Sequence, residues 1–203
     1  MDPDLALLER WCAGDSEAGQ ALFARHFREI YRFFEHKVGA DADDLAQRTF
    51  LECIAARERF RGLSTFRTYL FGIARHELLD YLRRVSHREH VDFDATSIAE
   101  LITSPSRRLD RSRQVEQLRA ALQGMPAEQQ LLLELHYWHD MDAAALGEML
   151  GAATGTIRVR LLRARRALRD RMLALGGTGA LEGLEADRLG SSLSDPEIEH
   201  SPV

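Results

Sequence analysis

The densest run of chemically active side chains in this sequence lies between residues 154 and 172 and consists of guanidinium groups. Seven arginines occur from Arg158 to Arg171, against the single acid Asp170. Guanidinium groups form paired hydrogen bonds with phosphate oxygens and with guanine edges. A helix that merely needed solubility would gain from alternating charges four residues apart, so this composition favours binding of a polyanion over a solvated arginine-rich face.

Two helical patterns position these arginines. A short apolar pattern spans residues 143–150, and a longer one follows with apolar residues at intervals of three and four, namely Ile157, Leu161, Ala164 and Leu168. Gly151 between them permits the left-handed conformation that ends a helix, and Asp142 and Thr154 are predicted N-caps. The segment therefore predicts a helix-turn-helix, in which the second helix lies in the major groove of DNA. Thr156, Arg158 and Arg160 are then expected at base edges and residues 163–169 at phosphates.

A second group of arginines accompanies aromatic residues between Arg57 and Arg88. The pattern predicts a basic loop followed by a helix that is capped by Ser64 or Thr65 and runs to about Arg84. Cationic grooves with nearby aromatic rings bind single-stranded nucleic acid, where stacking contributes about 1–3 kcal/mol per base. The aromatic residues also keep helical spacing, so packing in a core is the alternative.

Three helical patterns precede this loop, over residues 5–13, from the predicted N-cap Asp15 to Val38, and from near Asp41 onward. Aromatic residues on one side of the second pattern, including Phe23, Phe27, Phe33 and Phe34, are predicted to form a core. The acids at the start of the third pattern are stabilised there by the positive end of a helix dipole. No histidine or further acid completes a catalytic or metal site beside them, so we expect no enzyme activity, no metal and no cofactor.

The composition is consistent with one large or two small domains, since the chain has 203 residues of which 45% are hydrophobic. It contains no run of eighteen apolar residues and its first residues lack the features of a signal peptide, which predicts a cytoplasmic protein without membrane insertion. Cys12 and Cys53 are predicted to be buried free thiols. The net charge of −5 arises from an acidic segment over residues 173–203, before which acidic and basic side chains are equal in number.

Several segments resemble one protein family. The residues GTIRVRLLRARRAL, which follow DMDAAALGEMLG, closely resemble region 4 of the extracytoplasmic-function (ECF) sigma factors, which belong to the sigma-70 family of RNA polymerase subunits. LRAALQGMPAEQQLLLELHYWHDM resembles the leading helices of that region. GDSEAGQALFARHFREIYRFF, DADDLAQRTFLECI and RFRGLSTFRTYLFGIARHELLDYLRR resemble region 2. The chain departs from the usual pattern at Tyr69, where the family has Trp, and at His76, where it has Asn.

The resemblance implies an all-α protein with two small helical domains, a region 2 helical bundle and a region 4 helix-turn-helix, joined by a flexible linker. The expected boundaries are 4–85 for region 2, 86–112 for the linker, with a short helix near 98–102, and 113–172 for region 4. The composition of residues 173–203 predicts a disordered acidic tail, which could shield the arginine helix or be a passive solvated end.

The resemblance also implies three sets of site residues. The set expected at the minus-35 promoter element is Thr154, Thr156, Arg158, Arg160, Arg163, Arg165 and Arg166. The set expected at the minus-10 element is Arg59, Phe60, Arg61, Leu63, Ser64, Arg67, Arg75, His76, Asp80, Arg83 and Arg84. The set expected to contact RNA polymerase is Asp44, Gln47, Arg48 and Glu52, while Leu45, Phe50 and Ile54 hold the domain together.

The function implied is that of a sigma factor, which directs the RNA polymerase core to promoters, recognises the minus-35 element and melts the minus-10 element. Its expected partners are the beta-prime clamp helices and beta flap of the polymerase core, promoter DNA and, as a further option, an anti-sigma factor, with no small-molecule substrate. The alternative is a stand-alone helix-turn-helix regulator that binds duplex DNA without polymerase, which leaves the arginine and aromatic loop unexplained. An enzyme acting on nucleic acid would need a catalytic constellation that the sequence does not display.

Overall fold

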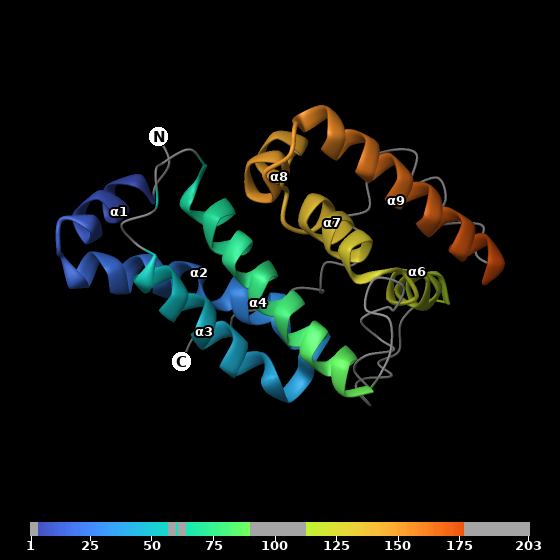
Figure 1. Ribbon diagram of the computed structural model, residues 1–203, viewed down its shortest axis with the longest axis horizontal. Helices are drawn as coiled ribbons and strands as arrows, with labels where there is room; N and C mark the ends of the chain where they lie inside the picture. Colours follow the sequence, from blue (N-terminus) through green and yellow to red (C-terminus); the bar gives the residue numbers. More distant parts are fainter. Residues whose placement is uncertain (1–3, 57–59, 61–63, 90–112, 177–203) are drawn as a thin grey trace, which may run out of the picture.

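The structure, a computed structural model, describes residues 4–56, 60, 64–89 and 113–176. These residues form helices without strands, which confirms the all-α prediction (Figure 1). In chain order the elements are α1 (Leu5–Cys12), α2 (Ser16–Val38), the 3₁₀ turn η1 (Gly39–Asp41), α3 (Ala42–Ala55), α4 (Phe66–Glu89), α6 (Arg113–Gln123), α7 (Ala127–Tyr137), α8 (Ala143–Leu150) and α9 (Thr154–Ala174).

Helices α1 to α4 pack together as one bundle, and local signals in the sequence set their ends. The Asp15 side chain accepts hydrogen bonds from the backbone amides of Glu17 at 3.0 Å and Ala18 at 3.1 Å, which caps α2 as predicted. Gly39 ends α2 with a φ of 59°, a conformation that glycine adopts without a steric cost. The side chains that fill the centre of this bundle include Leu22, Ile30, Phe33, Phe34, Leu45, Leu70 and Leu78.

Three residues of this bundle differ from the sequence-based expectation. Phe27 and Ile54, which were expected in the core, are 44% and 47% exposed, because they line an open groove between α2 and α3 that no other described helix covers. Cys12, at the end of α1, is also exposed, whereas Cys53 is buried as predicted.

The two thiols should therefore differ in reactivity. Burial raises the pKa of Cys53 to about 12, so at pH 8 its thiolate is scarce as well as inaccessible. We expect an alkylating reagent to add one label to the native protein, at Cys12, and two labels in concentrated urea, both counted by mass spectrometry. Rapid double labelling of the native protein would contradict the burial of Cys53.

Helices α6 to α9 form the second unit, whose core contains Leu131, Leu133, Leu135, Leu146 and Leu168. Helix α7 ends at Tyr137, which is buried. Trp138 follows the helix and is half-buried. In the first unit, α4 continues to Glu89, beyond the expected end near Arg84, because neither glycine nor proline interrupts it.

The two units contact each other, with α8 lying against α4. The expected linker beyond Glu89, its short helix at 98–102 and the acidic tail beyond Gly176 lie outside the described residues. Within the described ranges, no helix is both long enough and apolar enough to cross a bilayer.

Candidate nucleic-acid interface

Helices α8 and α9 form the predicted helix-turn-helix. The Asp142 carboxylate accepts hydrogen bonds from the amides of Ala144 at 3.0 Å and Ala145 at 2.8 Å, so it caps α8. Gly151 has a φ of 60° and ends α8 in the left-handed conformation. The turn is closed by the amide of Ala152, which donates to the carbonyl of Gly147 at 2.9 Å. These three local features fix the angle at which α9 leaves the turn.

The predicted cap of α9 was wrong by one residue. Ala153 is the N-cap, since it has the extended backbone of that position and its carbonyl accepts the first helical hydrogen bond, from the amide of Ile157 at 3.1 Å. Thr154 is the first residue of the helix itself, so its backbone is already helical. The sequence pattern favoured Thr154 because threonine is a common cap and alanine is not.

Helix α9 separates its apolar and cationic residues onto different faces. Its buried stripe consists of Ile157, Leu161, Ala164, Leu168 and Met172. The residues of the minus-35 set that lie exposed are Thr156, Arg158, Arg160, Arg163 and Arg166, while Thr154 is half-buried. The four exposed arginines of this set therefore lie on the solvent side of α9, away from its buried stripe.

Arg165 differs from the other arginines of the set because it packs inside the second unit. Its guanidinium carbon lies 5.4 Å from the centre of the Tyr137 ring, and its Nη2 lies 3.3 Å from Nε2 of His136. His136 Nδ1 lies 2.7 Å from the carbonyl oxygen of Met141, to which it donates, and its Nε2 is therefore the acceptor for Arg165. This contact attaches α9 to α7, and the pairing could not be seen in the sequence because the two residues lie 29 positions apart.

Helix α4 carries the residues of the minus-10 set on two different faces. Thr65 Oγ1 accepts a hydrogen bond from the amide of Thr68 at 3.1 Å, which fixes the start of the helix as predicted. Arg67 and Arg75 point toward the second unit and form ion pairs with Glu29 and Glu128. The residues on the outer side are His76, Asp80, Arg83 and Arg84. The structure thus does not bring all six strand-contact candidates of α4 onto one surface.

The outer group forms a short polar network. Asp80 lies 2.8 Å from Arg83 and 3.7 Å from His76, which holds these side chains side by side along the middle of α4. Arg83 and Arg84 border an open cleft between α3 and α4, and Arg48 and Glu52 line its other wall. Candidates for strand contact and for polymerase contact therefore share one surface.

The loop before α4 is described only in part. Phe60 packs against Tyr69, with ring centroids 5.0 Å apart, and against Phe66 at 6.5 Å, while Ser64 is half-buried. Arg59, Arg61 and Leu63 lie outside the described residues. Tyr69, which stands where the family has Trp, therefore places an aromatic ring against Phe60.

The four polymerase-contact candidates are all exposed on α3. Asp44 and Arg48 form an ion pair of 2.8 Å across one helical turn. Asp41, at the start of α3, makes no cap hydrogen bond and instead accepts from the Tyr81 hydroxyl at 2.6 Å. Burial and this carboxylate raise the pKa of Tyr81 to about 12. Asp44 therefore takes part in a surface ion pair, and Asp41 attaches the start of α3 to α4.

Comparison with known proteins decides the family. The model of sigma-70 region 2 matches residues 22–88 and that of sigma-70 region 4 matches residues 115–168. The chain is 31% identical over 157 residues to the ECF RNA polymerase sigma factor SigC of Mycobacterium tuberculosis, covering 76% of this chain and 83% of the relative. The chain belongs to the ECF sigma factors of the sigma-70 family. A second sigma factor of that organism, SigM, is 31% identical over 182 residues, which cover 87% of both chains.

Two solved structures share the fold of this sigma factor. CnrH, solved in complex with the cytosolic domain of CnrY, matches with a TM-score of 0.59 and 22% identity, covering 85% of this chain and 99% of CnrH. The sigma factor RpoE of Bartonella quintana, solved with the anti-sigma factor NepR, matches with a TM-score of 0.56 and 22% identity, covering 75% of this chain and 95% of RpoE.

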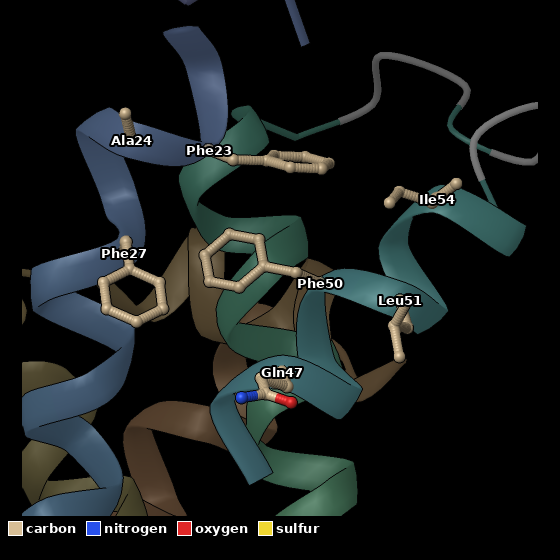
Figure 2. A pocket seen from close by; sticks show the side chains of 7 residues that line it. All are labelled: Phe23, Ala24, Phe27, Gln47, Phe50, Leu51 and Ile54. Atoms are coloured by element: carbon tan, nitrogen blue, oxygen red, sulfur yellow. The ribbon is translucent and has the colours of Figure 1, made fainter. Parts of the chain in front are cut away.

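Sequence reasoning missed one surface of this sigma factor, an apolar groove between α2 and α3. Figure 2 shows Phe23 and Phe27 on α2 facing Phe50, Leu51 and Ile54 on α3. Leu51 is 65% exposed, so the groove is open to solvent. The signal was present in the sequence, because Leu51 and Ile54 are three residues apart and so lie on one face of α3, beside its buried face. Helix α3 therefore carries apolar side chains on a second face that the core of the first unit does not cover.

Proposed function

We propose that this sigma factor directs the RNA polymerase core to specific promoters, where α9 recognises the minus-35 element and α4 with its preceding loop melts the minus-10 element. The observation that carries the proposal is the exposed arginine face of α9. That face lies on the second helix of a helix-turn-helix, the position from which side chains reach bases and phosphates in the major groove. Arg158 and Arg160 lie in the first two turns, where base contacts are made, and Arg163 and Arg166 lie further along the helix.

The minus-10 contacts are supported by the outer face of α4. Arg83, Arg84 and His76 are exposed there, and a strand of DNA would meet these cations before it reached the aromatic pair of Phe60 and Tyr69. Opening a duplex requires that an unstacked base is held against an aromatic or apolar surface, which repays the cost of unstacking. We therefore infer that the proposed melting site combines the exposed cations of α4 with the loop that precedes this helix.

Contact with the polymerase core is proposed for α3. Asp44, Gln47, Arg48 and Glu52 lie exposed along it, and Gln47 also borders the apolar groove of Leu51 and Ile54. Protein interfaces combine an apolar centre with a polar rim, and this helix offers both. The protein would supply no catalytic activity of its own and would work in the cytoplasm beside the polymerase. An anti-sigma factor is a further proposed partner.

Transcription reconstituted with purified components tests the proposal. Polymerase core and this protein together should start transcripts at discrete sites on fragments of its own genome, and core alone should not. A stand-alone regulator would instead bind duplex DNA in the absence of core and would not be retained by immobilised core. Retention on core with discrete transcript starts supports the sigma factor, and duplex binding without retention supports the alternative.

A further inference from the structure

The exposed side of α9 carries apolar residues as well as arginines. Val159, Leu162 and Leu173 are 47%, 46% and 49% exposed. Their spacing places them on one side of the helix, opposite the buried stripe that begins at Ile157. Three arginines lie among them on the same side. We call this surface the outer ridge of α9, and it consists of Val159, Leu162, Arg163, Arg166, Arg169 and Leu173.

The cations of the outer ridge have little negative charge beside them. Within the described residues, Arg163 and Arg166 make no ion pair, and Arg169 Nε lies 3.8 Å from the carboxylate of its neighbour Asp170. These arginines follow one another at intervals of three residues, so they are neighbours on the helix surface and repel one another. The outer ridge is therefore stabilised by a ligand that brings negative charge.

DNA accounts for the arginines but not for the whole outer ridge. The first turns of a recognition helix meet base edges, and the cations that follow meet phosphates. Leu173 lies about four turns beyond Val159, at the far end of the helix, and a phosphate offers an apolar side chain no favourable contact. A ligand that covers the full length of the ridge needs carboxylates and apolar side chains together, which is a property of a peptide.

The sequence supplies such a peptide shortly after α9. Residues 181–187 read LEGLEAD, in which two leucines alternate with three carboxylates. These residues lie outside the described part of the chain. The carboxylates can form charge-assisted hydrogen bonds with guanidinium groups, and the leucines can bury apolar surface. The segment is therefore complementary to the outer ridge in both charge and polarity.

The end of α9 fixes the point from which this segment starts. Gly176 has a φ of 74° and its amide donates to the carbonyl of Leu173 at 3.0 Å, so the chain leaves the helix axis here. The Gln117 side chain on α6 donates to the carbonyl of Leu175 at 3.1 Å, which holds this end in place. An extended chain from Gly176 to Glu182 spans about 20 Å, whereas Arg166 lies only about 15 Å back along the helix. The carboxylates of the segment can therefore reach the ridge.

We propose that residues 181–187 dock on the outer ridge of α9 in the DNA-free protein and compete with DNA for it. The three carboxylates pair with Arg163, Arg166 and Arg169, and the leucines cover the apolar residues of the ridge. A short tether holds the segment at a local concentration on the order of millimolar, so that even a weak contact is populated. The inference rests on the proposed function, because it takes the exposed side of α9 as the DNA-binding surface.

Neutralising the segment within the full chain tests the competition. The variant Glu182→Gln, Glu185→Gln, Asp187→Asn keeps the length and the leucines, and the probe is a fluorescent duplex of random sequence without polymerase. If the segment covers the ridge about three-quarters of the time, this variant should bind the duplex about four-fold more tightly than the wild-type chain at low salt. The gain should disappear at about 1 M salt, where ion pairs are screened.

The same tail provides the matched control. Asp195→Asn, Glu197→Gln, Glu199→Gln removes equal charge at positions further from α9. This control should gain less than about two-fold in duplex binding, because the removed charges are more distant and better screened. Equal gains from the two variants would mean a general effect of net charge and would overturn the docking.

A second pair of variants tests the apolar part of the contact. Leu173→Ser adds no charge, yet it should raise duplex binding about two-fold because it removes an apolar residue that the segment covers. Leu175→Ser is the control, since Leu175 is 46% exposed at the C-cap of α9 and lies outside the outer ridge. Equal binding by these two variants would contradict the docking of leucines on the ridge.

Nuclear magnetic resonance locates the contact without DNA. Backbone amide peaks of the wild-type chain and of the variant neutralised at 182, 185 and 187 should differ at residues 159–173 and coincide on α1. Unchanged peaks along α9 would overturn the docking, and differences that grow with protein concentration would assign the contact to a second copy of the chain and overturn it equally. Failure to start transcripts with core would instead overturn the proposed function, while the amide peaks would still report on the docking.

Discussion

Replacing Leu161 with Ala should lower the free energy of unfolding by about 2–5 kcal/mol, the range measured when a fully buried leucine leaves a cavity. Leu161 is 2% exposed on the buried stripe of α9, between Ile157 and Ala164. The substitution would weaken the packing of α9 against the other helices of the second unit. Urea unfolding followed by circular dichroism measures it.

The adjacent residue provides the matched control. Leu162 is 46% exposed, so Leu162→Ala removes the same atoms from the same helix without leaving a cavity. We expect it to change the free energy of unfolding by less than about 0.5 kcal/mol, as surface substitutions usually do. Equal losses for the two variants would mean that the apolar stripe of α9 is not where the structure places it.

The second large effect concerns DNA. Arg158→Ala should weaken binding by about 1–3 kcal/mol at one position of the minus-35 element, because a paired hydrogen bond to a base edge discriminates by that amount. Arg158 lies in the first turns of α9 and is exposed, as a base contact requires. The measurement is promoter-dependent transcription on templates that carry each single-base change of the element.

Arg166→Ala is the comparison within the same helix. Arg166 is exposed two turns further along, where phosphates are expected, so its loss should weaken all templates alike and reduce the slope of log affinity against log salt by about 1. If Arg158→Ala also weakened every template equally, Arg158 would be a phosphate contact and base recognition would lie elsewhere on α9.

Much of this architecture could be predicted because its signals are local. A carboxylate that caps a helix binds amides two and three residues away, so Asp15 and Asp142 were identified from their neighbours. Gly151 ends α8 because glycine adopts the left-handed backbone conformation without a steric cost. The arginine face of α9 followed from helical periodicity, since the apolar stripe fixes which side remains for the cations.

The ion pairs made by Lys37 and Arg67 could not be predicted, because the two members of each pair are far apart along the chain. Lys37 and Glu134 are separated by 97 positions, and Arg67 and Glu29 by 38. The sequence displays Arg67 as one more cation in a basic segment, and it was assigned to DNA from that composition and from the family resemblance, neither of which reveals its partner Glu29. Ile54 was misplaced for a related reason, since helical spacing gives the faces of α3 but not the neighbour that covers each face.

Asp4, near the N-terminus, bonds to two residues of α2. Its carboxylate lies 2.5 Å from Nη1 of Arg25 and 2.7 Å from Nε2 of His26. Burial alone would lower the pKa of His26, yet the hydrogen bonds that its ring donates to the carboxylates of Glu29 and Asp4 raise it. His26 therefore links Asp4 to Glu29, the carboxylate that pairs with Arg67. Trimming the protein to begin at Leu5 would remove the Asp4 carboxylate and should weaken this chain of contacts, although it changes no residue of α3, α4 or α9.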